Sequence, residues 1–141
     1  MKVFLDTNVL VSGFATRGLC ADVVREVLTS HDLVISTQLL AGLARVLRNK
    51  IGAPSSFVAE IVEMLKQDAC VSKPTPLPDV LLRDRSDLPI LSSALNGKAD
   101  LLVTGDKELL ALGKVKNLEI VSPRGFWEKL KAQPAHAPGK R

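Results

Sequence analysis

The sequence is poor in aromatic residues and has no long apolar run. Of its 141 residues, four are Phe, one is Trp and none is Tyr, so the core must be built mostly from Leu, Val, Ile and Ala. Leu and Val at this density are typical of an α/β sheet that helices cover on both faces. No apolar run approaches the ~20 residues of a membrane helix. The first residues have the pattern of a strand, so we expect no signal peptide. We therefore expect a cytoplasmic protein that has no contact with a membrane.

Cysteine and histidine are also scarce. Cys20 and Cys70 lie in apolar patterns that look helical, and they show no C-x-x-C spacing. We expect buried free thiols there, rather than a disulfide or a zinc site. His31 and His136 are far apart and show no ligand spacing. The chain also lacks the G-x-S-x-G elbow, the Walker loop and the G-x-G-x-x-G loop, which removes the signatures of three large enzyme classes.

Charge and length indicate one domain with a basic tail. The formal net charge is +4, from 19 basic and 15 acidic residues, which is compatible with nucleic acid but does not require it. Residues 1–132 are long enough for one domain with a substantial core. From residue 133 to residue 141, Pro, Ala, Gly and basic residues dominate, and we expect this tail to be disordered.

Predicted strands alternate with predicted helices along the chain. We expect strands over 2–5, 33–35, 101–104 and 118–121, with a brief edge segment at 80–82. We expect helices over 9–14 (broken near Gly13), 19–29, 37–50, 55–69, 88–96 and 108–112, and from 123 onward. This alternation predicts an α/β domain whose sheet is mainly parallel and whose strands are joined by right-handed crossovers.

Two of the predicted strands run into an acid. Residues 3–5 lead to Asp6, residues 101–105 lead to Asp106, and Asp87 comes just before a predicted helix. In a parallel sheet, the carboxyl ends of the strands share one edge, where ligands bind. Clustered acids repel one another unless a cation or shared protons neutralise them, and hard cations prefer oxygen ligands. The sequence therefore predicts a divalent metal site formed by Asp6, Asp87 and Asp106.

Helix capping is the simpler alternative for each acid taken alone. Asp is a preferred N-cap residue, and Asp6, Asp87 and Asp106 all precede predicted helices. Asn8 could cap the first helix in place of Asp6. The metal hypothesis therefore depends on the three acids meeting in space.

Several short segments, in this order and spacing, resemble those of one known family. They are 4–10 (Phe-Leu-Asp-Thr-Asn-Val-Leu), Ser36 with 38–41, Arg83-Asp84 with Asp87, Ala99-Asp100 leading to 103–107 (Val-Thr-Gly-Asp-Lys), and 122–126 (Ser-Pro-Arg-Gly-Phe). Over about residues 1–130 the chain resembles the PIN-domain family, and within it the VapC-like ribonuclease toxins of toxin–antitoxin modules.

The resemblance implies a three-layer α/β/α sandwich around a parallel sheet. It also implies a set of four acids that binds Mg²⁺ or Mn²⁺ and hydrolyses RNA phosphodiester bonds. Asp6, Asp87 and Asp106 match three of these acids. Asn8, Thr104 and Asp84 match supporting polar positions, and Thr104 could either orient a carboxylate or hydrogen-bond the scissile phosphate. The resemblance further implies a homodimer and an antitoxin partner.

One position departs from the family pattern. Gly42 stands where the family usually carries Glu, in a predicted helix whose interior Gly costs about 1 kcal/mol relative to Ala. The protein could work with three carboxylates, with water or Gln38 filling the gap. It could be a weakened or inactive relative that still binds partners, or the position could carry a substitution relative to the natural protein.

An acidic pocket that acts on RNA needs basic neighbours. The basic residues that flank the predicted site are Arg45, Arg48, Lys50, Arg83, Arg85 and Lys107. Two other functions compete with a nuclease: an aspartyl-phosphate phosphatase with Asp6 as the nucleophile, and an inert binding module. The phosphatase usually needs a second acid two residues after the nucleophile, where this chain has Asn8.

Overall fold

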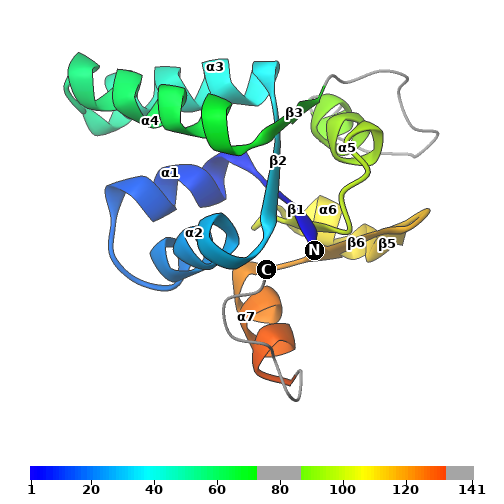
Figure 1. The fold of residues 1–141 in the computed structure, drawn as a ribbon. Helices are drawn as coiled ribbons and strands as arrows, with labels where there is room; N and C mark the ends of the chain where they lie inside the picture. The colour runs from blue at the N-terminus through cyan, green and yellow to red at the C-terminus, as the bar shows by residue number, and fades with distance from the viewer. Residues whose placement is uncertain (73–86, 133–141) are drawn as a thin grey trace.

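The computed structural model describes residues 1–72 and 87–132, and these residues form a six-stranded sheet with the strand order β3-β2-β1-β4-β6-β5 (Figure 1). All neighbouring strands are parallel except β5 and β6, which are antiparallel. The strands are β1 (Lys2–Leu5), β2 (Asp32–Ser36), β3 (Cys70–Ser72), β4 (Leu101–Val103), β5 (Lys114–Val115) and β6 (Leu118–Val121). The predicted α/β class with a mainly parallel sheet is confirmed.

Helices connect the parallel strands and cover both faces of the sheet. They are α1 (Thr7–Ala15), α2 (Leu19–Ser30), α3 (Thr37–Val46), the π-helical turn η1 (Leu47–Ile51), α4 (Ser55–Asp68), α5 (Asp87–Asn96), α6 (Lys107–Leu112) and α7 (Pro123–Ala132). Right-handed crossovers place the helices after β1 and β2 on one face and those after β3 and β4 on the other. Figure 1 shows α1 to α4 together on one face and α5 and α6 on the other.

The sheet reverses its direction of growth between β1 and β4. From β1 the chain adds β2 and then β3 on one flank, and it then returns to place β4 on the other flank of β1. Such a switch point leaves a crevice at the carboxyl ends of the two central strands, and ligands of open α/β sheets bind there. Asp6 follows β1 and Thr104 follows β4, so the fold places both residues at this crevice.

Strand β1 consists almost entirely of apolar residues because both of its faces are buried in the core. Val3, Phe4 and Leu5 are all fully buried, although successive side chains of a strand point to opposite faces. Helices must therefore cover both faces of β1, as is usual in parallel sheets. At the C-terminal end of α2, His31 contacts the aromatic ring of the fully buried Phe126 in α7, with 5.9 Å between ring centroids.

Some details differ from the sequence predictions. Helix α1 begins earlier than expected and continues through Gly13, because a glycine lets α1 pack closely against the Val24 side chain of α2. Both cysteines are free thiols, as expected, and Cys20 lies in α2. Cys20 is only partly buried, however, and Cys70 begins strand β3 and is exposed, so the predicted burial of both thiols and the helical position of Cys70 are wrong. The short strand β5 was not predicted, because two residues carry no periodic signal. The expected segment at 80–82 and the tail at 133–141 lie outside the described residues.

No helix in residues 1–72 and 87–132 is long and apolar enough to cross a membrane.

Candidate metal and nuclease site

Asp6 sits at the carboxyl end of β1, buried at the switch point. Only 6% of its surface is exposed. Its backbone N–H donates to the carbonyl of Val103 at 3.0 Å, which continues the pairing of β1 with β4 past the end of the strand. The residue also serves as the N-cap of α1, where its Oδ1 accepts a hydrogen bond from the Thr7 N–H at 2.7 Å. The first helix is therefore capped by Asp6, and Asn8 lies exposed inside it.

Thr104 connects Asp6 to the second acid. Its fully buried hydroxyl donates to Oδ2 of Asp6 at 2.7 Å and accepts from the backbone N–H of Asp106 at 3.0 Å. One hydroxyl group thus fixes the carboxylate that follows β1 and the backbone that carries the acid after β4. This geometry is what a carboxylate-orienting residue requires.

Asp106 caps α6 with one carboxylate oxygen. Its Oδ1 accepts hydrogen bonds from the N–H groups of Glu108 at 2.8 Å and Leu109 at 3.1 Å. The side chain is half-buried, so it can still reach solvent. Both Asp6 and Asp106 are therefore helix caps, as the simpler alternative expected. Capping still leaves acceptor capacity for a ligand, because each oxygen of Asp6 accepts one of these bonds and both bonds to Asp106 end on Oδ1.

The two acids influence each other electrostatically. Burial raises the pKa of Asp6 above its ordinary value of 3.8, the hydrogen bonds from Thr104 and Thr7 act in the opposite direction, and the negative charge of Asp106 raises it further. A buried carboxylate with a second carboxylate nearby is an unfavourable arrangement for a protein without a counter-charge. The two acids predicted from the strand ends do meet in space.

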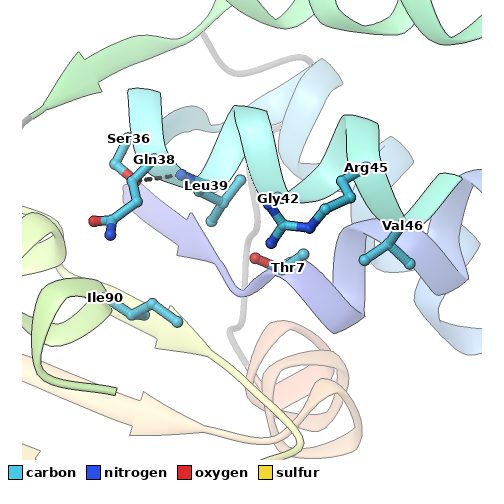
Figure 2. Close-up of a pocket in the computed structure, with 8 residues that line it drawn as sticks. All are labelled: Thr7, Ser36, Gln38, Leu39, Gly42, Arg45, Val46 and Ile90. Atoms are coloured by element: carbon cyan, nitrogen blue, oxygen red, sulfur yellow. Dashed lines mark hydrogen bonds between the residues drawn. The ribbon is translucent and has the colours of Figure 1, made fainter. Parts of the chain in front are cut away.

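A cavity of about 190 Å³ lies beside Thr7, the residue that follows Asp6, between α3, the start of α1 and Ile90 of α5 (Figure 2). The residues that line it are Thr7, Ser36, Gln38, Leu39, Gly42, Arg45, Val46 and Ile90. Thr7 belongs to both places, because its N–H binds Asp6 and the residue also lines the cavity. Ser36 ends β2 and caps α3 by accepting from the Leu39 N–H at 2.9 Å, which places the first turn of α3 at the same sheet edge.

The sequence model of the PIN domain matches residues 2–108. This span includes β1, β4 and both acids of the pair. The chain belongs to the PIN-domain family.

Among solved structures, the fold of this PIN domain is similar to a chain of VapBC2 from Rickettsia felis, which was crystallised bound to a DNA fragment from its promoter. The TM-score is 0.56 and the sequences are 14% identical, over 86% of this chain and 98% of that one. At this identity the likeness concerns the fold. No curated protein sequence matches the chain significantly.

The structure describes the remaining predicted site residues only in part. Asp87 begins α5, one helical turn before Ile90 of the cavity. The structure describes the backbone of Asp87 but not its side chain. Asp84, Arg83 and Arg85 lie outside the described residues altogether. The predicted meeting of three acids is therefore tested here only for Asp6 and Asp106.

The basic residues expected around the site differ in position. Arg45 lines the cavity, whereas Arg48 and Lys50 follow in η1 and are exposed away from its lining. Lys107 is the exposed first residue of α6. Of the described basic side chains in the prediction, Arg45 is thus the one that lines the cavity, and Lys107 is the one that directly follows an acid of the pair.

Gly42 lies in helix α3, as predicted, on the face of α3 that lines the cavity. A Cβ atom built there would meet one described atom within 4 Å, the Nη2 of Arg45 at 3.8 Å. The glycine is therefore needed neither for close packing nor for an unusual backbone conformation. Its effect is to leave space, and Gln38, four residues earlier, lines the same cavity. That Gln38 stands in for the missing acid stays a prediction.

Thr7, Val46 and Ile90 line the cavity but were not singled out from the sequence. Thr7 carried a detectable signal, since it follows the strand-ending acid Asp6. Val46 and Ile90 are ordinary apolar positions of α3 and α5, and only the packing of the helices shows that they border the site.

The carboxylates of Asp6 and Asp106 provide some of the oxygen ligands that a hard divalent cation needs. Two carboxylates at one buried edge, one of them destabilised by the other, offer oxygen ligands and a need for positive charge. In the part of the chain with described side chains, no group of three His, Cys, Asp or Glu residues is placed to hold a metal. Mg²⁺ commonly binds through one or two carboxylates with waters completing its shell, so a pair is chemically sufficient.

Proposed function

We propose that this PIN domain is a divalent-metal-dependent endoribonuclease that hydrolyses RNA phosphodiester bonds. Membership of a family whose members are typically nucleases supports a nuclease. The observation that carries the metal dependence is the Asp6–Asp106 pair, in which burial and like charge both disfavour the ionised form of Asp6. A bound cation relieves both costs.

In this proposal Asp6 and Asp106 hold the cation, Mg²⁺ or Mn²⁺, and Asp87 contributes a further ligand or accepts a hydrogen bond from a coordinated water. When bound, the cation lowers the pKa of a water and neutralises phosphate charge during in-line attack. Thr104 keeps the Asp6 carboxylate in one orientation through its hydroxyl. The Thr7 N–H fixes the other oxygen of the same carboxylate, so neither oxygen must reorganise when the cation binds.

The biological setting is a further part of the proposal. The fold likeness to a chain of VapBC2 supports a toxin of the VapC type with an antitoxin as protein partner. The homodimer is the assembly that the family resemblance of the sequence implies. A cytoplasmic location accords with a partner and a substrate of this kind. Family membership argues against the aspartyl-phosphate phosphatase, whose second acid is in any case missing at Asn8.

Gly42 supports a second candidate function, that of a weakened or inactive PIN domain that binds partners. The observation that favours it is the open space beside Gly42, where the family pattern has an acid. Cleavage assays separate the two functions, because an inert binding module would bind RNA or a protein partner without hydrolysing either.

The experiment compares cleavage of a single-stranded RNA by the wild type, Asp6→Asn and Asp32→Asn, with Mn²⁺, with Mg²⁺ and with a chelator. Asp32 is the matched control, since it is an exposed acid at the opposite end of β2 from the site. We expect metal-dependent cleavage by the wild type and Asp32→Asn and a loss of about 100-fold or more in Asp6→Asn. Equal cleavage by all three proteins, or cleavage in the chelator, would contradict the proposal.

A further inference from the structure

Among the residues whose side chains the structure describes, no acid lines the cavity beside Thr7, and its lining combines polar with apolar residues. Its lining residues contribute the hydroxyl groups of Thr7 and Ser36, the amide of Gln38 and the guanidinium of Arg45. The acid that the family pattern would add from α3 is absent, because position 42 is Gly. A hollow with a fixed positive charge and neutral hydrogen-bond donors suits an anion rather than a cation.

Arg45 is placed to act inside this hollow. Its Nη2 lies 3.8 Å from the position that a Cβ of residue 42 would occupy. Figure 2 shows its side chain turned back along α3, so that the guanidinium lies beside Gly42 and toward Thr7. A side chain longer than that of Ala at residue 42 would compete with the guanidinium for this space, so the glycine leaves the space to the arginine.

We infer that the cavity is a phosphate-binding subsite, in which the Arg45 guanidinium and the Gln38 amide bind a phosphodiester group of the RNA strand next to the one at the acid pair. The inference rests on the proposed nuclease function for its choice of ligand. Thr7 joins the two places, since its N–H fixes Asp6 while the residue borders the cavity. A guanidinium can bind two phosphate oxygens at once, which gives orientation as well as affinity.

The inference changes what an acid at residue 42 would do. A Glu at this position would stand three residues before Arg45 on the same helix, within reach of an ion pair. It would neutralise the guanidinium and place negative charge where a phosphate is expected. Gly42→Glu should therefore weaken RNA binding rather than simply restore a fourth metal ligand.

The test measures binding of a short single-stranded RNA by fluorescence anisotropy in the presence of a chelator, which makes the result independent of any metal. The variants are Arg45→Gln, Arg45→Lys and Gly42→Glu, and the control is Arg17→Gln. Arg17 is an exposed arginine beyond the far end of α1, roughly 13 Å along the helix from its start at the site.

We expect Arg45→Gln and Gly42→Glu to weaken RNA binding at least tenfold, Arg45→Lys to retain part of the affinity, and Arg17→Gln to change it less than twofold. The slope of log K against log salt should fall by about 0.7 in Arg45→Gln, as expected for one lost phosphate contact on a single strand. Titration with inorganic phosphate should shift the amide NMR signals of Thr7, Gln38 and Gly42 in the wild type but not in Arg45→Gln.

Equal losses in Arg45→Gln and Arg17→Gln would indicate diffuse electrostatic attraction and overturn the inference, as would a wild type that binds neither RNA nor phosphate. If Asp6→Asn abolishes cleavage while Arg45→Gln leaves RNA binding unchanged, the subsite is wrong and the nuclease stands. If Arg45 controls RNA binding but no metal supports cleavage, the nuclease is wrong and the chain is an RNA-binding PIN domain.

Discussion

The crevice of this PIN domain has two unlike sides. The acid side consists of Asp6, Thr104 and Asp106, and its polar groups are tied together by hydrogen bonds of 2.7 to 3.1 Å. The α3 side consists of Gln38, Gly42 and Arg45, which border an open cavity. On the first side the chain has arranged fixed negative charge, and on the second it has left space beside a positive charge.

The difference teaches how the two sides are built. The acid side comes from strand ends, so its residues are held by the backbone pairing of β1 with β4. The α3 side comes from a helix surface, where the removal of one side chain changes the chemistry without changing the backbone. We therefore expect substitutions on the acid side to change both stability and metal binding. We expect a substitution on the α3 side to change one property of the protein without the other.

The acid side should respond strongly to pH. Burial and the charge of Asp106 raise the pKa of Asp6 in the folded protein, whereas the unfolded chain keeps the ordinary value of 3.8. Between the two values the folded protein holds a proton that the unfolded chain has released. The stability of the metal-free protein therefore falls as pH rises through this interval and stays lower above it. A cation must displace the same proton, so its apparent affinity should rise by up to about tenfold per pH unit there.

Calorimetric titration with Mn²⁺ over a series of pH values measures this effect, and Asp6→Asn should remove the pH-dependent binding. RNA binding through Arg45, measured with a chelator, should stay constant over the same series because a guanidinium keeps its charge. A pH-independent affinity for Mn²⁺ would show that Asp6 is not a ligand.

Thr104→Val should give the largest loss of stability on the acid side. The change removes the hydroxyl that serves Asp6 and the Asp106 N–H, and it leaves a buried carboxylate oxygen without its donor. We expect a loss of about 2 kcal/mol in the free energy of unfolding, measured with urea. Thr104→Ser keeps the hydroxyl and is the control. If Val and Ser destabilise the protein equally, the hydrogen bonds contribute nothing and the contrast between the two sides weakens.

Asp106 allows capping and metal binding to be distinguished. Asp106→Ala should cost about 1 kcal/mol of stability, since it removes the acceptor for two N–H groups of α6. Asp106→Ser should restore most of this loss, because Ser is a good N-cap residue. Stabilisation by Mn²⁺ should disappear in both variants, since neither supplies a carboxylate. Thermal unfolding with and without Mn²⁺ measures both effects, and a Ser variant that still responds to Mn²⁺ would rule out Asp106 as a ligand.

Gly42→Ala should give the smallest effect and the opposite sign. The new methyl group meets open space, and Ala favours a helix over Gly, so we expect a gain of about 0.5–1 kcal/mol in urea unfolding. Gly13→Ala is the matched control on α1, where a Cβ would overlap the Val24 side chain and stability should fall. A loss of stability in Gly42→Ala would mean that the glycine serves packing and is not there to leave the cavity open.

Much of the fold could be predicted from the sequence. The apolar run before Asp6, the cap at Ser36 and the Ser122–Pro123 start of α7 each mark an element boundary that the structure reproduces within a few residues. Strand β3 at Cys70 was missed, because three residues next to a long helix carry too little period to be told from its last turn. Strand β5 was missed for the same reason.

The site was less predictable than the fold. The strand-end position of Asp6 and Asp106 was readable because an apolar run ends at each of them. For Thr104 the sequence left two roles open, and the structure shows its hydroxyl bonded to the Asp6 carboxylate, in line with one of them. The second hydrogen bond, from the Asp106 N–H, was not predicted, since a threonine at the end of a strand has several equally ordinary partners. The role predicted for the Asp87 side chain is untested, because the structure does not describe that side chain. The predictions for Asp84 and for the tail from residue 133 are untested as well, because these residues lie outside the described part of the chain.

The sequence alone determined the alternation of strands and helices and the placement of an acid after β1 and before α6, because periodicity and capping are local properties of the chain. Only the tertiary structure decided that these two acids meet, through a crossover that brings β4 beside β1. The tertiary structure also decided that Gly42 opens a cavity beside Arg45, since the space around a glycine depends on what packs against its helix.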